Sequence, residues 1–138
     1  MKILLDTNVL IDYITKREPF YENAREVIIL CTDDKIEACV ASHSITNIFY
    51  ILRKNFSIDE RRSIIKWLCE VTAVIGIDKE KIINAVENNS FNDFEDCLQD
   101  ECAVYFGADY IITRNINDFS VGKVKAITPS EFIDIIKK

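Results

Sequence analysis

Short apolar runs alternate along this chain with segments of helical periodicity, and this alternation restricts its fold more than any other feature. Apolar runs of four to six residues predict buried strands at Lys2–Leu5, Ile36–Ala41, Ala73–Ile77, Tyr110–Thr113 and Val124–Ile127. Strands separated by helices are typical of an α/β fold with a central, mainly parallel sheet. The length of 138 residues favours a single domain over residues 1–138.

The segments between the strands are predicted to be helical: Thr7–Ile14, Phe20–Cys31, Ser44–Lys54, Asp59–Glu70, Lys79–Glu87, Phe94–Phe106 and Pro129–Lys137. Ser57 or Asp59 can cap the fourth helix, and Thr128 before Pro129 is typical of a helix start. Gly107 fits the residue that ends the sixth helix.

Polar residues follow the first and fourth predicted strands. Asp6 comes directly after the first strand, and Asn115 and Asp118 follow the fourth. In parallel sheets, ligands gather beyond the carboxyl ends of the strands where the strand order reverses. If these two strands are neighbours, the three side chains converge on one crevice. A buried carboxylate such as Asp6 needs a hydrogen-bonding, charged or metal partner.

The segment "NDFEDCLQD" offers a further carboxylate, Asp96, with two interpretations. Asp93 can be the N-cap, which puts Glu95 and Asp96 in the first turn, where carboxylates are favoured. A helical wheel puts Asp96 with Gln99, Asp100 and Ala103, opposite an apolar stripe of Phe94, Leu98, Cys102 and Tyr105. This polar face points either to solvent or to a polar site. With Asp6 and Asp118, Asp96 would supply the oxygen ligands that Mg²⁺ or Mn²⁺ prefers.

Charge and motif content narrow the function classes. The net charge is −6, and no basic residue lies between Lys81 and Arg114, so this segment suits a cation or a basic partner. The basic residues around "RKNFSIDERRSIIKW" fit a phosphate-binding surface or, preferably, a solvated helical face. The single histidine, His43, excludes a nuclease mechanism with two histidines, and acyl-transfer and nucleotide motifs are absent.

Location and redox state can also be predicted. No apolar run is long enough to cross a membrane, and Asp6 interrupts the first run, so we expect a cytoplasmic protein without a membrane partner. Five cysteines without paired zinc spacing are expected to be reduced core residues.

These segments together resemble the PIN domain, the nuclease fold of VapC-type toxins of bacterial toxin–antitoxin pairs. The resemblance rests on "LLDTNVLID", "SHSITNIFYILRK" and "DFEDCLQDECAVYFGADYIITRNINDF". It implies a three-layer α/β/α sandwich with adjacent first and fourth strands, a homodimer, an antitoxin partner, and RNA cleavage dependent on Mg²⁺ or Mn²⁺.

Site residues follow from the resemblance position by position. Asp6 matches the first acid of the family and Asp96 the third, while Asp118 and Asn115 match the polar positions of the last motif. Supporting polar positions fall on Thr7, Asn8 and Thr113.

One residue departs from the family pattern. Asn47 stands where the family usually has a Glu, which removes one negative charge and is expected to lower metal affinity. Asp93 or Glu95 would be placed to compensate.

Two other classes stay open. A haloacid dehalogenase-like phosphatase also begins with Asp after a strand, but it needs a second Asp where Asn8 stands. A PIN-like module that binds RNA or an antitoxin without cutting is compatible with Asn47.

Overall fold

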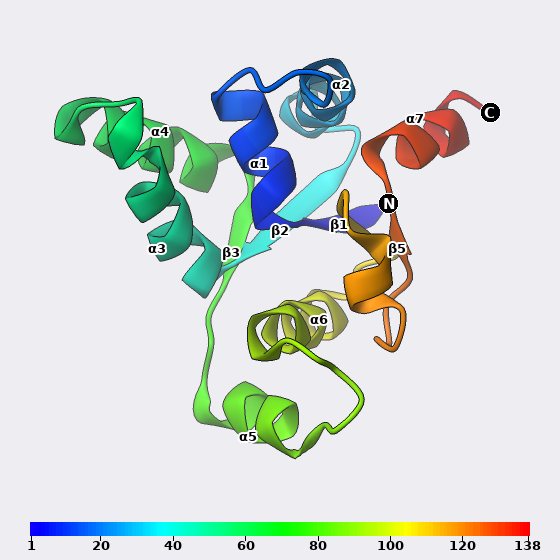
Figure 1. Ribbon diagram of the computed structural model, residues 1–138. Helices are drawn as coiled ribbons and strands as arrows, with labels where there is room; N and C mark the ends of the chain where they lie inside the picture. The colour runs from blue at the N-terminus through cyan, green and yellow to red at the C-terminus, as the bar shows by residue number, and fades with distance from the viewer.

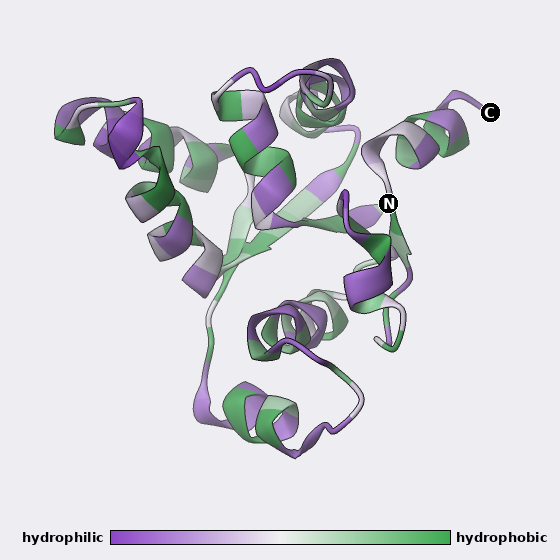
Figure 2. Ribbon diagram, viewed as in Figure 1, coloured by the Kyte–Doolittle hydropathy of each residue, from purple (hydrophilic) through white to green (hydrophobic).

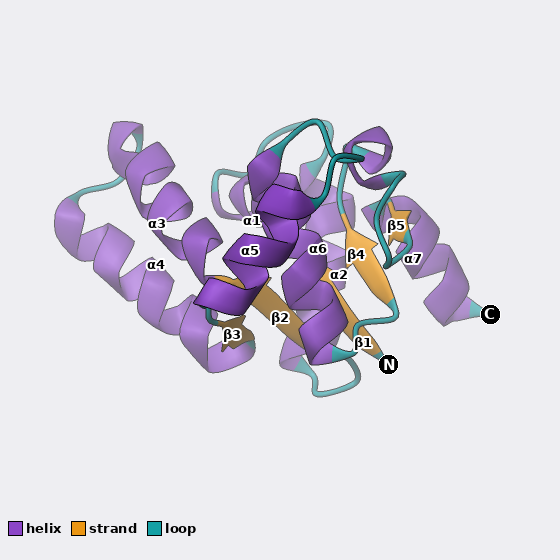
Figure 3. Cartoon of the chain, turned by 90° about the horizontal axis from the view of Figure 1, so that it is seen from below, coloured by secondary structure: helices purple, strands orange, loops and turns teal.

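The computed structural model describes residues 1–138 and contains one five-stranded sheet. Its strands are β1 (Lys2–Leu5), β2 (Glu37–Ala41), β3 (Ala73–Ile75), β4 (Tyr110–Ile112) and β5 (Ala126–Ile127). All four strand pairs are parallel, in the order β3-β2-β1-β4-β5, which is visible from left to right in Figure 3. The predicted parallel sheet with adjacent first and fourth strands is therefore confirmed.

Seven helices cover the two faces of the sheet: α1 (Thr7–Ile14), α2 (Tyr21–Thr32), α3 (Ser42–Ile51), α4 (Ile58–Val71), α5 (Lys79–Glu87), α6 (Phe94–Phe106) and α7 (Pro129–Lys137). Figure 1 shows α1, α2 and α7 above the sheet, α3 and α4 at its left, and α5 and α6 below. Two short 3-10 helices, η1 (Leu52–Lys54) and η2 (Ile116–Phe119), complete the chain. No helix is long and apolar enough to cross a membrane.

Side chains of β1 alternate between the two layers of the core. Ile3 and Leu5 belong to a core cluster with residues of α1, α2 and α7, whereas Leu4 packs in a second cluster with Cys102 and Ala103 of α6. All three β1 residues are fully buried. Figure 2 shows that the strands of the sheet are mostly hydrophobic, whereas the helices contain both hydrophilic and hydrophobic residues. A strand buried on both faces explains the continuous apolar run in the sequence.

Capping contacts explain most helix boundaries. Ser57 caps α4 and Thr128 caps α7, each with a Glu three residues later that completes a capping box. Gly107 ends α6 with a φ of 77°, in the left-handed region that favours glycine. Of the two predicted caps for α4, Ser57 is thus the one used.

Local details differ from the expectations at several points, and the third strand, for example, ends at Ile75 instead of Ile77. The strand predicted from Val124 begins only at Ala126, because the Val124 N–H donates to Asp100 Oδ1 instead of to a neighbouring strand. The apolar stripe of α6 is buried only in its middle, at Leu98 and Cys102, since Phe94 is 46% and Tyr105 72% exposed. The five cysteines are free, and Cys69 is exposed and not a core residue.

Candidate functional site

The strand order reverses between β1 and β4, and Asp6 lies at this point. The chain adds β2 and β3 on one side of β1 and then places β4 on the other side, with Leu5 paired to Ile112. Asp6 follows β1 and is the N-cap of α1. The carboxyl ends of β1 and β4 therefore meet at the position where open α/β sheets bind ligands.

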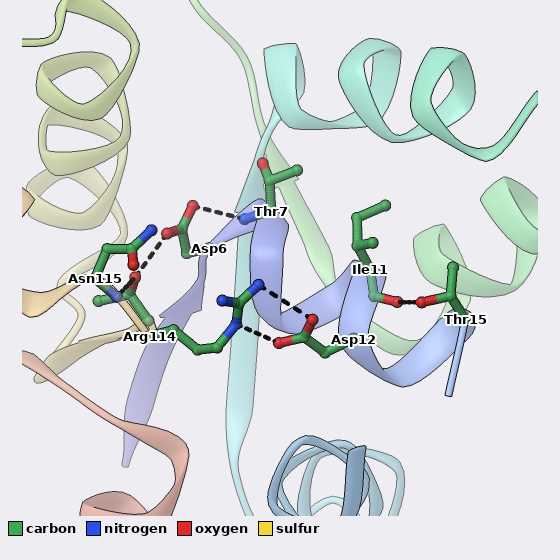
Figure 4. A network of polar contacts seen from close by, with 8 residues as sticks. Asp6, Thr7, Ile11, Asp12, Thr15, Arg114 and Asn115 are labelled. Carbon is green, nitrogen blue, oxygen red and sulfur yellow. Dashed lines mark hydrogen bonds and ion pairs between the residues drawn. The ribbon is translucent and has the colours of Figure 1, made fainter. Parts of the chain in front are cut away.

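Neutral donors surround the buried Asp6 carboxylate, which is 6% exposed. Oδ1 accepts hydrogen bonds from the Thr7 amide at 2.7 Å and from Gln99 Nε2 at 2.9 Å, and the Thr7 bond is drawn in Figure 4. Oδ2 accepts from Thr113 Oγ1 at 2.7 Å. Burial raises the pKa of Asp6, although these three bonds act in the opposite direction.

Thr113 connects Asp6 to the segment after β4. Its hydroxyl donates to Asp6 and accepts from the Asn115 amide at 3.0 Å. Thr113 is fully buried and lies behind Asp6 instead of lining the open space in front of it. Its contacts are those of a residue that orients the carboxylate.

The second carboxylate of the site, Asp96, begins α6. Asp93 is the N-cap, as predicted, and accepts from the Asp96 amide at 3.1 Å. The half-buried Asp96 side chain accepts no hydrogen bond from the chain. Burial and the negative charges of Asp93, Asp6 and Asp118 raise the pKa of Asp96 to about 7. The polar face of α6 thus points into the molecule, because Gln99 and Asp100 are also buried.

A cleft of about 490 Å³ brings most of the predicted residues together. Of the residues predicted from the sequence, its lining contains Asp6, Thr7, Asn8, Asn47, Glu95, Asp96, Asn115 and Asp118. Asp93 and Thr113 are not part of the lining. The basic residues from Arg53 to Lys66 are likewise absent from it, and Arg53 and Arg61 instead lie over the rings of Tyr50 and Phe49.

Several lining residues were missed by the sequence analysis: Ile11, Arg17, Tyr50, Ile51, Gln99 and Arg114. A signal existed for Gln99, since the helical wheel already placed it beside Asp96. No sequence signal marked Arg17 or Arg114, because nothing in the sequence shows that the turn after α1 approaches the end of β4.

The donor set of the cleft fits a hydrated divalent cation. No group of three or more His, Cys, Asp or Glu side chains is close enough to bind one ion directly. Mg²⁺, however, commonly keeps several waters and uses one or two carboxylates. Asn8 Oδ1 and Gln99 Oε1 are buried acceptors without a hydrogen-bond partner. Water molecules on a cation would supply the donors that these oxygens lack.

Comparisons with known proteins agree with the fold. A family model described as PIN domain matches residues 2–117. Among solved structures, a chain of VapBC2 from Rickettsia felis bound to promoter DNA has a TM-score of 0.65 and 18% identity, with 93% of this chain and 98% of that chain covered. A chain of a toxin–antitoxin complex from Klebsiella pneumoniae has a TM-score of 0.68 and 19% identity, covering 92% and 97%.

A third similar structure is VapC20 from Mycobacterium tuberculosis, a toxin that cleaves the sarcin–ricin loop. It has a TM-score of 0.63 and 12% identity, with 79% of this chain and 86% of that chain covered. At these identities the likeness shows a shared fold. A search of curated protein sequences gives no significant match.

Proposed function

The chain belongs to the PIN domain family, and from this premise we propose that it is a Mg²⁺- or Mn²⁺-dependent endoribonuclease. One observation carries the proposal: Asp6, Asp96 and Asp118 come from three distant segments and line the same cleft at the reversal of strand order. None of these carboxylates is paired with a basic residue, so together they suit a divalent cation. Such a cation can in turn bind a phosphodiester.

In this proposal Asp6, Asp96 and Asp118 hold a hydrated ion, in part through its bound water molecules, and Asn47 and Asn115 complete its polar shell. A bound ion of this kind lowers the pKa of a water molecule and neutralises charge on the phosphodiester. Asn47 contributes an amide oxygen but no charge, so metal affinity is lower than with a Glu at this position.

The other polar residues of the site orient these groups. Thr113 and Gln99 hold the two oxygens of Asp6 at a fixed angle, since each donates a hydrogen bond to a different oxygen. Asp93 fixes the first turn of α6 and so the position of Asp96. Glu95 lies in the lining as an additional negative charge.

We further propose that the protein is the toxin of a toxin–antitoxin pair. Support comes from solved structures of the same fold, which include toxin–antitoxin complexes and a toxin that cleaves the sarcin–ricin loop. Such a protein would act in the cytoplasm as a homodimer of single-domain chains and be inhibited by an antitoxin.

Calorimetric titration of Mn²⁺ tests the metal site first. Wild type should bind Mn²⁺, whereas Asp6→Asn and Asp96→Asn should not, because each removes a charge from the cleft. Asp134→Asn, an exposed residue of α7 outside the cleft, is the matched control and should bind like wild type. Circular dichroism on each variant checks that folding is retained.

RNA cleavage then separates the enzyme from the alternative, a PIN-like module that binds RNA or an antitoxin without cutting. Asn47 is the observation that favours this second candidate, because it weakens the charge of the cleft. Cleavage of a structured RNA with Mn²⁺, lost with EDTA or Asp6→Asn, would support the nuclease. Binding of RNA unchanged by EDTA and never followed by cleavage would support the module.

A further inference from the structure

We propose that Arg17 and Arg114 form a binding site for an RNA backbone phosphate next to the carboxylates of the cleft. Both arginines line the same cleft as Asp6 and Asp96. Both guanidinium groups also lie over the ring of Phe20, with centroid distances of 6.0 Å for Arg17 and 4.1 Å for Arg114. This inference rests on the proposed function, because it takes RNA as the substrate.

The Arg114 guanidinium is held in one orientation by a buried carboxylate. Its Nε donates to Asp12 Oδ2 at 2.6 Å and its Nη2 to Asp12 Oδ1 at 3.2 Å, as Figure 4 shows. Asp12 is 1% exposed, so the carboxylate side of this contact is shielded from water. An arginine pre-oriented in this way loses little side-chain entropy when it binds a second group.

Donors are left over on Arg114 after this contact. A guanidinium has five N–H groups, and Asp12 accepts from only two of its nitrogens, Nε and Nη2. The Arg114 side chain is 23% exposed, and Nη1 donates to no acceptor within the chain. The unused N–H groups are therefore available to a ligand in the cleft.

Arg17 adds a second positive charge without a matching acid. It lies in the turn after α1, where its backbone amide donates to the Asp12 carbonyl at 3.0 Å. Its exposed side chain forms no ion pair. Because Asp12 neutralises only one of the two guanidinium groups, this part of the cleft has an excess positive charge, which favours binding of an anion.

The cleft thus has an acidic part and a basic part, and a nucleic acid strand can bind to both. The acids Asp6, Asp96 and Asp118 suit a cation on the phosphate to be cleaved, whereas the two arginines suit an uncompensated phosphate. Successive phosphates of one RNA strand would supply both the phosphate at the cation and the phosphate at the arginines. A phosphate held at the arginines would fix the register of the strand at the carboxylates.

The affinity of a short fluorescein-labelled single-stranded RNA, measured by anisotropy in EDTA over a range of salt concentrations, tests the site. Arg17→Gln and Arg114→Gln should each weaken binding by about 3- to 10-fold and reduce the slope of log affinity against log salt by about 0.7. Arg25→Gln, an exposed arginine of α2 outside the cleft, is the matched control and should change neither value. Arg17→Gln removes no ion pair, so its result does not depend on the stability of the Asp12–Arg114 contact.

The outcomes distinguish this inference from the proposed function. If wild type binds Mn²⁺ and cleaves RNA while both arginine variants keep the affinity and salt slope of wild type, the phosphate site is wrong and the nuclease stands. If wild type neither binds Mn²⁺ nor cleaves, but the arginine variants lose affinity, the phosphate site stands on a non-catalytic module. Absence of RNA binding by wild type at low salt would overturn the phosphate site.

Discussion

Two carboxylates one turn apart on α6, Asp96 and Asp100, have opposite surroundings. Burial raises the pKa of both. The Asp100 oxygens accept from the amides of Lys123 and Val124, all at 3.1 Å, whereas the Asp96 oxygens accept no hydrogen bond from the chain. Burial and a raised pKa therefore do not separate a functional acid from a structural one. Under the proposed function, the feature that distinguishes Asp96 is its unused acceptor oxygens, which face the cleft.

The Asp100 contact also has a positional consequence. It fastens the segment after η2 to the helix that carries Asp96. A Cβ on Gly122 would lie 2.6 Å from Asp100 Oδ1, so the loop approaches closely at this point. Asp118 lies in η2, just before this loop. One helix thus carries one carboxylate of the cleft and anchors the segment that carries another.

The same Asp-to-Asn change should affect Mn²⁺ binding and RNA cleavage at Asp96 but not Mn²⁺ binding at Asp100. Asp96→Asn is expected to lower metal-dependent RNA cleavage by at least about 100-fold, because it removes a charge that faces the ion. Asp100→Asn should leave Mn²⁺ binding by the folded protein unchanged. Initial cleavage rates and Mn²⁺ calorimetry measure both. Equal loss of Mn²⁺ binding in the two variants would contradict the division into functional and structural acids.

Stability should show the reverse order. Asp100→Ala leaves the buried amide of Val124 and the partly buried amide of Lys123 without their acceptor, which is expected to lower the free energy of unfolding by about 2 kcal/mol. Asp96→Ala removes repulsion from neighbouring acids and is expected to leave the free energy of unfolding unchanged or slightly higher. Urea denaturation without metal at pH 8 measures the free energy of unfolding of both variants. A larger loss from Asp96→Ala would overturn the comparison.

The raised pKa of Asp96 predicts a pH dependence whose sign is unusual for a carboxylate. Its value of about 7 in the folded state exceeds the ordinary value of about 3.9, so between these pH values the folded state binds the extra proton. Stability without metal should therefore fall as the pH rises from 4 to 7. Mn²⁺ affinity should rise as the pH approaches 7, by up to about tenfold per unit, and level off above it.

Thermal unfolding and Mn²⁺ calorimetry across this pH range measure the two trends. Asp96→Asn is the control for the stability measurement, and the stability of this variant should fall less steeply between pH 4 and 7. If the variant shows the same fall, another group, of which the buried Asp6 is the first candidate, is responsible.

The smallest expected effect comes from restoring the charge that the cleft lacks. Asn47→Glu should raise Mn²⁺ affinity by about 3- to 10-fold, because a fourth carboxylate faces the ion. The added repulsion should lower stability without metal by about 0.5–1 kcal/mol. Asn47→Gln, which lengthens the side chain without adding charge, is the matched control. If Asn47→Gln raises Mn²⁺ affinity as much as Asn47→Glu, the length of the side chain at this position limits the affinity, and its charge does not.

The sequence predicted the fold well because each element carries its own signal. Every strand and helix expected from apolar runs and periodicity is present, and Ser57, Thr128 and Gly107 act as the predicted caps or stop. Boundaries moved where a tertiary contact competes, as at Val124, whose amide bonds to Asp100. Such a contact between distant segments has no local pattern.

The site was predictable in part for the same reason. Asp6, Asp96 and Asp118 follow strand or helix boundaries that the sequence marks, and adjacency of β1 and β4 brings them to one cleft. The Arg114 side chain is held in the cleft by Asp12, which comes from α1. Pairings between side chains 102 residues apart depend on packing geometry, which periodicity does not encode.

The strand order also sets when during synthesis the site can exist. Asp6 is made early, but β4 must pair with β1 before Thr113 reaches Asp6, and η2 then brings Asp118. A ribosome that has not yet released this last part carries a chain with an open β1 edge and an incomplete cleft. If the protein cleaves RNA, the ribosome that makes it is safe from the emerging chain until the segment that carries Thr113 and Asp118 has left the ribosome and folded.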